Sequence, residues 1–159
     1  MKGDTMKITI LPAALIAIFV LGDANAQDDA VKKELAKLEG TWDIVSGVER
    51  GQPSSEQLLK NLKFVFKGTQ LTFAGDDVMA KKVGKIAVKI DASTTPKCID
   101  FDLKVDAGAL KDRLLEGIYE WKGDELKLCI SEVAGNRPLD FEAKEGSNRV
   151  LFVLKRQKP

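Results

Sequence analysis

The sequence predicts an all-β protein, an antiparallel up-and-down β-barrel of about eight to ten short strands with a short N-terminal helix. Three observations support this prediction. Short runs of alternating apolar and polar residues recur along the chain, turn residues such as Gly, Asp and Asn separate them, and helical periodicity is confined to short segments. The 159 residues, 44% hydrophobic and 31% charged, suit one globular domain. Closure into a barrel also removes exposed sheet edges.

The first 26 residues predict a secretory signal peptide. Lys2 and Lys7 precede an apolar run, which is followed by the small residues of "ANA" at 24–26 and then by a polar stretch. Cleavage is expected after Ala26. A membrane anchor is the weaker alternative, because the run is shorter than the roughly 20 residues of a span and Pro12 interrupts it. We therefore expect an exported protein, periplasmic or secreted, that is soluble after cleavage and has no membrane span.

Residues 27–39 predict a short lead-in helix, and residues 40–157 predict a single barrel domain. On the helix, Val31, Leu35 and Leu38 share one face. After this segment the apolar period changes from that of a helix to that of a half-buried strand. The barrel is therefore expected to begin where the helix ends.

The barrel domain then consists of strands separated by turns. The predicted strands, in chain order, are residues 41–49, 62–67, 69–74, 78–90, 97–105, 113–121, 125–131, 139–143 and 149–156. Between the first two strands we expect a turn and a short helix, with Ser54 or Ser55 as its cap. The stretch 78–90 is expected to be broken near Gly84, and residues 106–112 are expected to form a loop.

The strand alternation also predicts which side chains face the barrel interior. They are Trp42, Ile44, Val48, Phe64, Phe66, Leu71, Phe73, Ile86, Val88, Ile90, Ile99, Phe101, Leu103, Leu126, Leu128 and Ile130. A barrel of about eight strands is either filled by its own side chains or holds one small ligand. The sequence leaves both alternatives open. The candidate ligand contacts within this set are Phe64, Phe66, Phe73, Val88 and Phe101.

The segment that opens the first strand resembles a known signature. "GTW", with Gly40 and Trp42, resembles the G-x-W motif of lipocalins and related calycin-like barrels. In those proteins the tryptophan closes one end of the barrel, and a basic residue of the last strand packs across it. The resemblance implies this structural role for Trp42 beneath Lys155 or Arg156. An arginine over a tryptophan face is also physically favourable, so Arg156 is the expected partner.

Further stretches extend the resemblance over nearly the whole barrel domain. "LEGTW", "PKCIDFD", "GIYEW-KGDELKLC", "NRP-LDF" and "VLKR" occur in this order between residues 38 and 156. Together they resemble the planctomycete lipocalin-like domain family. That family has no established activity, so the resemblance implies a lipocalin-like fold and no particular function.

The composition argues against several classes of function. Lys plus Arg number 25 and Asp plus Glu number 24, and this net charge of +1 offers no electrostatic case for binding nucleic acid. The chain has no His, which is the commonest general base and the commonest metal ligand. A Ser-His-Asp or Cys-His site therefore cannot form within the chain. We expect no enzymatic activity, no cofactor and no metal site.

The two cysteines, Cys98 and Cys129, fall on the face opposite the large apolar residues. A further strand is expected to lie between theirs. Strands lie about 4.8 Å apart, so the Cα atoms are expected about 9–10 Å apart, beyond the roughly 4.4–6.8 Å of a disulfide. Two free thiols are therefore favoured, and a disulfide is the alternative that export would permit.

Glu116 and Glu120 lie on a strand whose orientation the sequence leaves open. If Ile118 faces the interior, both glutamates do too, and each buried carboxylate then needs a partner such as a polar group of a ligand. If Tyr119 and Trp121 face inward instead, the glutamates are solvated. Glu116, Ile118 and Glu120 are therefore tentative ligand-binding residues in the barrel interior. The two glutamates would also be the first residues to test if any activity were found.

Two functions from different classes suit these observations. The first is an exported, non-enzymatic barrel that binds a small, mostly apolar ligand. The second is a protein-interaction module that engages an envelope or secreted protein, such as a barrel-type protease inhibitor. An interior cavity favours the first function, and an exposed apolar patch on the loops favours the second.

Overall fold

The computed structural model describes residues 24–103 and 112–158. The predicted signal peptide up to residue 23 and the predicted loop up to residue 111 lie outside the described residues. The helices are α1 (Ala24–Leu38), α2 (Glu56–Asn61) and α3 (Val78–Lys82). The strands are β1 (Gly40–Glu49), β2 (Gln52–Pro53), β3 (Lys63–Lys67), β4 (Gln70–Ala74), β5 (Ile86–Asp91), β6 (Lys97–Leu103), β7 (Arg113–Lys122), β8 (Glu125–Ser131) and β9 (Arg149–Arg156).

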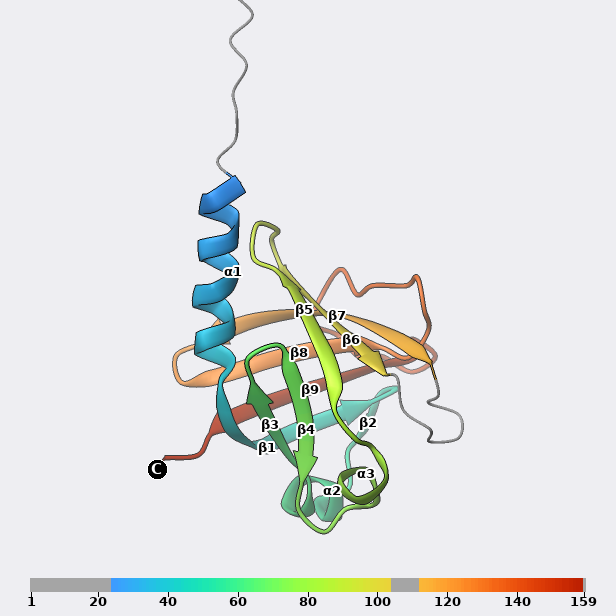
Figure 1. Ribbon diagram of the computed structural model, residues 1–159. Coiled ribbons are helices and arrows are strands. Elements are labelled where there is room, and N and C mark those ends of the chain that lie inside the picture. The colour runs from blue at the N-terminus through green and yellow to red at the C-terminus, as the bar shows by residue number, and fades with distance from the viewer. Residues whose placement is uncertain (1–23, 104–111, 159) are drawn as a thin grey trace, which may run out of the picture.

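The strands form one antiparallel sheet in the order β2-β1-β3-β4-β5-β6-β7-β8-β9 (Figure 1). β1 also pairs with β9, with Trp42 opposite Arg156 and Glu49 opposite Val150. This pairing closes β1 and β3–β9 into a barrel, and β2 extends the sheet only by a short hairpin with β1. The predicted up-and-down barrel with a short N-terminal helix is confirmed, and the arrangement is consistent with a lipocalin-like barrel.

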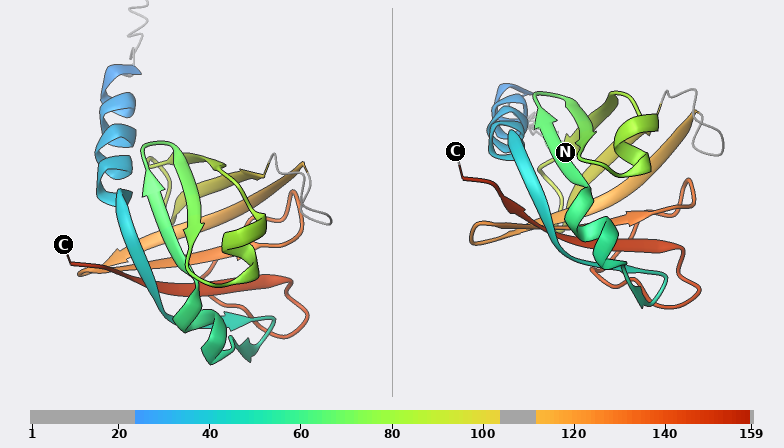
Figure 2. Two further views of the ribbon diagram at one scale, coloured as in Figure 1. Left: turned by 60° about the horizontal axis from the view of Figure 1, so that its bottom comes forward. Right: turned by 90° about the horizontal axis from the view of Figure 1, so that it is seen from below.

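The barrel has two unlike ends because neighbouring strands alternate in direction. At the first, which we call the α1 end, α1 leads into β1, β9 finishes, and three short turns join β3 to β4, β5 to β6 and β7 to β8. At the second, the α2–α3 end, α2 precedes β3, α3 follows β4, and the long β8–β9 loop of residues 132–148 begins. Figures 1 and 2 show α1 on the side of the C-terminus, away from α2 and α3.

A β-bulge divides β1 into two halves that present opposite alternations. The pairing of β1 with β9 shifts register between Ile44 and Ser46. An extra residue in a strand turns every later side chain to the other face of the sheet. Beyond the bulge Gly47 is buried and Val48 is only half-buried, while Glu49, although exposed, lies on the inward side of the strand at the α2–α3 end. The prediction that Val48 faces the interior is therefore wrong.

Two segments that the sequence predicts as strands adopt other structures. α3 replaces the first half of one predicted strand, and residues 139–143 belong to the β8–β9 loop. In each case an aspartate accepts a hydrogen bond from the backbone two residues later: Asp77 from Met79 at 2.7 Å and Asp140 from Glu142 at 3.2 Å. Such local contacts satisfy backbone groups without a strand partner, and they compete with sheet formation.

Candidate ligand-binding cavity

A cavity of about 390 Å³ occupies the barrel interior at the α2–α3 end. Sites for small molecules are typically about 300–1,000 Å³ and mainly apolar, so this cavity is at the small end of that range. Phe64, Phe73, Phe101 and Phe152 form much of its wall, and Leu115 completes it on β7. The inward alternation of β3, β4, β6, β7 and β9 brings these side chains together.

The aromatic rings on this wall support one another. The Phe64 ring meets Phe73 edge-on at a centroid distance of 5.0 Å and Phe152 at 5.6 Å. Edge-to-face pairs of this kind are favourable beyond the surface that they bury. Phe66 and Val88, which the sequence also predicts as ligand contacts, are each 2% exposed within the core but do not line the cavity. The structure thus brings Phe64, Phe73 and Phe101 of the predicted set to the cavity.

Two short helices flank the cavity. Leu58 of α2 and Met79 of α3 contribute to its lining. Ser55 caps α2 by accepting a hydrogen bond from the Leu58 backbone at 3.2 Å. The backbone N–H of Asp77, just before α3, donates to the Asn61 carbonyl at the end of α2 at 3.3 Å. The two helices are therefore held together beside the cavity.

The charged side chains in the cavity lining are Glu49 and Glu132. Arg50 contacts one carboxylate oxygen of Glu132 through Nε at 2.7 Å and Nη2 at 2.6 Å. Glu49 accepts a hydrogen bond from the Ser54 hydroxyl at 3.2 Å. The strand pattern alone places Glu49 on the outer face, and its position in the cavity follows from the bulge in β1.

The opposite end of the barrel, the α1 end, is filled around Trp42. This side chain is 1% exposed, and its indole Nε1 donates to the Leu38 carbonyl at 2.8 Å. The guanidinium carbon of Arg156 lies 4.4 Å from the centroid of the Trp42 ring. Arg156 also donates hydrogen bonds to the backbone carbonyls of Lys37 and Glu39. Of the two basic residues expected near Trp42, the structure therefore places Arg156 over its ring.

A buried carboxylate joins α1 to the barrel at the same end. Glu34 is 5% exposed, and its Oε2 accepts hydrogen bonds from Trp121 Nε1 at 2.8 Å and Tyr119 OH at 3.2 Å. Lys97 and Lys37 approach Oε1 at 2.8 and 3.3 Å. Burial alone would raise the pKa of Glu34, but the hydrogen bonds from Lys97, Trp121 and Lys37 outweigh it and lower the pKa to about 2. Burial, together with the Glu34 charge, raises the pKa of Tyr119.

Sequence reasoning does not single out Glu34, although a signal for it exists. Glu34 follows Val31 by three residues and precedes Leu38 by four, so it lies on the apolar face of the helix. A charged residue on the apolar face of an amphipathic helix is a candidate for a buried partner. Its partners on β6 and β7 carry no comparable signal, because they lie far away in the sequence.

On β7 the structure resolves the two orientations that the sequence leaves open. Tyr119 is fully buried and Trp121 packs against the interior core. Glu116, Ile118 and Glu120 therefore lie on the outer face, which corrects their tentative placement in the barrel interior. The sequence is ambiguous here because both faces of β7 carry apolar residues. The outer face needs them because the β8–β9 loop packs over it.

The β8–β9 loop provides this outer cover. Ile118 lies in register between Cys98 on β6 and Cys129 on β8, and it is 1% exposed although it points away from the interior. Pro138 of the loop is among the fully buried residues. Both cysteines are free thiols, as their separation by β7 favours. Burial raises the pKa of the Cys129 thiol to about 11, which makes it a poor nucleophile at neutral pH.

Arg137 fastens this loop to the outer face. Its Nη1 lies 2.7 Å from Asp100 Oδ1 and donates to the Gly117 carbonyl at 2.8 Å. Its Nη2 lies 3.2 Å from Glu116 Oε1. Glu116 thus has a structural partner outside the barrel and makes no contact with the cavity.

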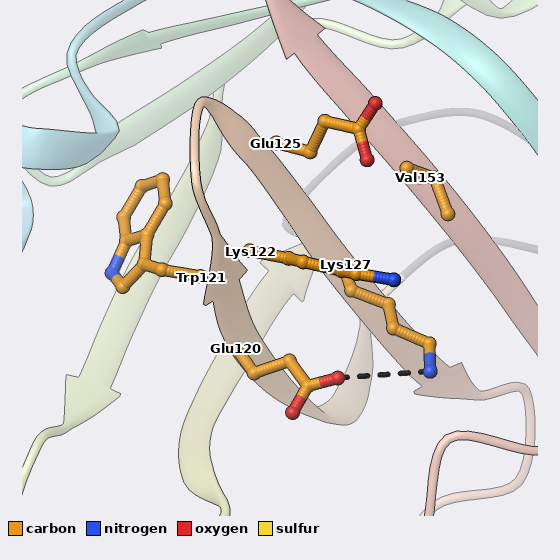
Figure 3. Close-up of a pocket in the computed structure, with 6 residues that line it drawn as sticks. All are labelled: Glu120, Trp121, Lys122, Glu125, Lys127 and Val153. Atoms are coloured by element: carbon orange, nitrogen blue, oxygen red, sulfur yellow. Dashed lines mark ion pairs between the residues drawn. The ribbon is translucent and has the colours of Figure 1, made fainter.

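A second hollow, of about 340 Å³, lies on the outside of the β7–β8 hairpin. Figure 3 shows Glu120 and Lys127 joined there by an ion pair of 3.6 Å, with Trp121 projecting away from Lys122 and Lys127. The Glu120 side chain is 47% exposed. The lining of this hollow includes the aromatic Trp121 and four charged residues, of which Glu120 and Lys127 pair with each other. The cavity inside the barrel is therefore the stronger candidate site.

The described part of the chain contains no group of three or more Cys, Asp or Glu side chains arranged to hold a metal ion. Within residues 24–103 and 112–158, no helix is long and apolar enough to cross a membrane. No protein-family model, curated protein or solved structure matches this chain. Its function is therefore inferred from the cavity and the residues around it.

Proposed function

We propose that this protein is an exported, non-enzymatic lipocalin-like barrel that binds a small, mostly apolar ligand at the α2–α3 end. The observation that supports this most directly is the cavity of about 390 Å³ with its phenylalanine wall. A ligand that buries about 200 Å² of apolar surface there gains on the order of 5 kcal/mol, before the costs of association are subtracted. Such a gain suits a ligand of modest size and affinity.

The contrast between the two ends of the barrel supports the same function. At the α1 end, Trp42 and Arg156 fill the barrel interior. A hollow of about 440 Å³ beside them is bordered by the charged residues Lys37, Asp124 and Lys158, so it suits an apolar ligand less well than the phenylalanine-walled cavity. At the other end, Leu58 and Met79 from two short helices border the space. Entry past α2 and α3 is therefore the route that the arrangement favours.

The export and the family membership in this proposal are supported by sequence features. The basic, apolar and small-residue segments before Gln27 support secretion, and the "GTW" motif supports a lipocalin-like barrel. N-terminal sequencing of the protein from its own host tests the first point. We expect the mature chain to begin at Gln27, and a chain that retains residues 1–26 would contradict export by cleavage.

The absence of enzymatic activity is also part of the proposal. The chain lacks His, and the titratable side chains in the cavity lining are the two glutamates, Glu49 and Glu132. Arg50 already pairs with Glu132. A lone exposed carboxylate suits the binding of a polar group better than coupled acid–base chemistry, which needs a second group with a different pKa.

Binding of a neutral fluorescent probe, N-phenylnaphthylamine, tests the cavity directly. Leu115 lines the cavity, and its neighbour Leu114 is 44% exposed on the outer face, so the two offer a matched pair of substitutions. We expect Leu115→Trp to fill the cavity and weaken probe binding at least about tenfold. Leu114→Trp should bind the probe as the wild type does. Circular dichroism and urea unfolding show whether both variants fold.

Two results would contradict the proposed function. One is a folded wild-type protein that does not bind the probe at all. The other is equal binding by folded Leu115→Trp and Leu114→Trp, which would place the probe outside the cavity. Native mass spectrometry of the mature protein from its own host then serves to identify a retained small molecule.

A second candidate function, protein interaction, is favoured by one observation. Leu139 is 83% exposed on the β8–β9 loop, directly after the fully buried Pro138. The loop is anchored by Arg137, so Leu139 is presented on a fixed support. A photo-crosslinking residue at position 139 should yield one defined protein adduct in the host, whereas the same residue at exposed Leu114 should not. Equal labelling from both positions, or none, would count against this function.

A further inference from the structure

Among the described residues, the lining of the cavity at the α2–α3 end carries two carboxylates and no basic side chain. Its ionisable members are Glu49 and Glu132, and both are acidic. Arg50 contacts Glu132 at 2.6 and 2.7 Å and offsets its charge. Glu49 accepts a hydrogen bond from the neutral Ser54 hydroxyl at 3.2 Å and forms no ion pair with any residue that the structure describes. Within the part of the chain that the structure describes, Glu49 is therefore the carboxylate of the lining that has no ionic partner.

Glu49 is held on a rigid part of the barrel. It lies in register with Gln52 of β2 on one side and with Val150 of β9 on the other, and Val150 also lines the cavity. The bulge between Ile44 and Ser46 turns the Glu49 side chain toward the cavity rather than toward the outer face.

We infer that the ligand of this cavity is an amphiphile with a cationic head, whose ammonium group pairs with Glu49 while its apolar part packs among the phenylalanines. This inference rests on the proposed function, because the head group reaches Glu49 only if the apolar part of the ligand binds in the cavity. An anionic amphiphile would bring a like charge beside Glu49 and is disfavoured. A neutral amphiphile keeps the apolar contacts but leaves Glu49 to solvent. The expected order of affinity is cationic, then neutral, then anionic.

The expected selectivity is modest because Glu49 is exposed to solvent. Solvent and salt screen an ion pair at an exposed rim. We therefore expect the cationic amphiphile to bind up to about fivefold more tightly than its neutral counterpart at low salt. The preference should shrink as salt is added, because the apolar contacts do not depend on charge screening.

Isothermal titration calorimetry with decylammonium, decanol and decanoate at neutral pH tests the inference, since these probes share one tail and differ in head charge. The wild-type protein is compared with Glu49→Gln and with the matched control Glu120→Gln. The control removes the same charge on the outer face of β7, where Glu120 pairs with Lys127. We expect Glu49→Gln to abolish the preference for decylammonium over decanol. Glu120→Gln should retain the wild-type preference.

The possible outcomes distinguish a failure of this inference from a failure of the proposed function. Equal binding of the cationic and neutral probes by the wild type would overturn the cationic head but keep the apolar cavity. Survival of the preference in folded Glu49→Gln would overturn the pairing of the head group with Glu49, since another group would then recognise the positive charge. If none of the three probes binds the folded wild type, both the inference and the proposed function fail.

Discussion

At the α1 end of the barrel, Trp42 and the fully paired Glu34 occupy the interior, whereas at the α2–α3 end the interior is hollow and Glu49 forms no ion pair with any described residue. Glu34 illustrates the α1 end, because it is buried and its carboxylate contacts four polar side chains. Glu49 illustrates the second, exposed with one hydroxyl contact. The difference shows how a small barrel can concentrate its packing in one half and so leave space for a ligand in the other.

The largest expected effect comes from removing the aromatic plug of the α1 end. Trp42→Ala should lower the free energy of unfolding by about 3–5 kcal/mol, because it deletes a fully buried aromatic ring and its hydrogen bond to Leu38. Urea unfolding measures the loss. A loss below about 1 kcal/mol would show that this end is not the main support of the barrel.

The next effect concerns the dependence of stability on pH through Glu34. Its folded pKa of about 2 lies below the ordinary value of 4.5, so its contribution is complete above the ordinary value and is lost as the pH falls toward 2. The contribution is on the order of 3 kcal/mol. Unfolding of the wild type and Glu34→Gln across this pH range should give curves that converge in acid.

A matched control for this effect is Glu120→Gln, because the Glu120 side chain is 47% exposed and pairs with Lys127. This variant should lose stability in acid with the same slope as the wild type. If Glu34→Gln also keeps that slope, the joint between α1 and the barrel does not depend on the Glu34 charge.

A smaller effect is expected on the wall of the cavity. Phe73→Ala should lower the free energy of unfolding by about 1–2 kcal/mol, because Phe73 is only partly buried and already borders empty space. Urea unfolding beside Trp42→Ala gives the comparison directly. A loss as large as that of Trp42→Ala would mean that the two ends contribute equally to stability.

The smallest effect is expected at the rim. Glu49→Gln should change the free energy of unfolding by no more than about 0.5 kcal/mol, because Glu49 is exposed and makes one neutral hydrogen bond. Thermal and urea unfolding at neutral pH check this. A clear destabilisation would indicate that Glu49 stabilises the β1–β2 hairpin, which would argue against a role in binding a ligand.

The sequence predicts the barrel and part of the cavity wall because strand alternation is a local property. Phe64, Phe73 and Phe101 face inward as their spacing indicates. The prediction that Val48 faces inward is wrong because the bulge in β1 depends on pairing with β9, which is about a hundred residues away in the chain. The prediction that Ile118 faces the barrel interior is wrong because the β8–β9 loop covers the outer face of β7. An apolar residue on that strand can therefore be buried without facing the interior.

By itself, then, the sequence determined the up-and-down barrel, the position of Trp42 at the start of β1 and the separation of Cys98 from Cys129 by one strand. These follow from side-chain period, turn residues and strand spacing, which depend on neighbouring residues along the chain. Only the tertiary structure decided that Glu34 is buried, that Glu49 turns inward and that one end of the barrel stays hollow. Each of these depends on contacts between segments far apart in the sequence, whose packing no local pattern encodes.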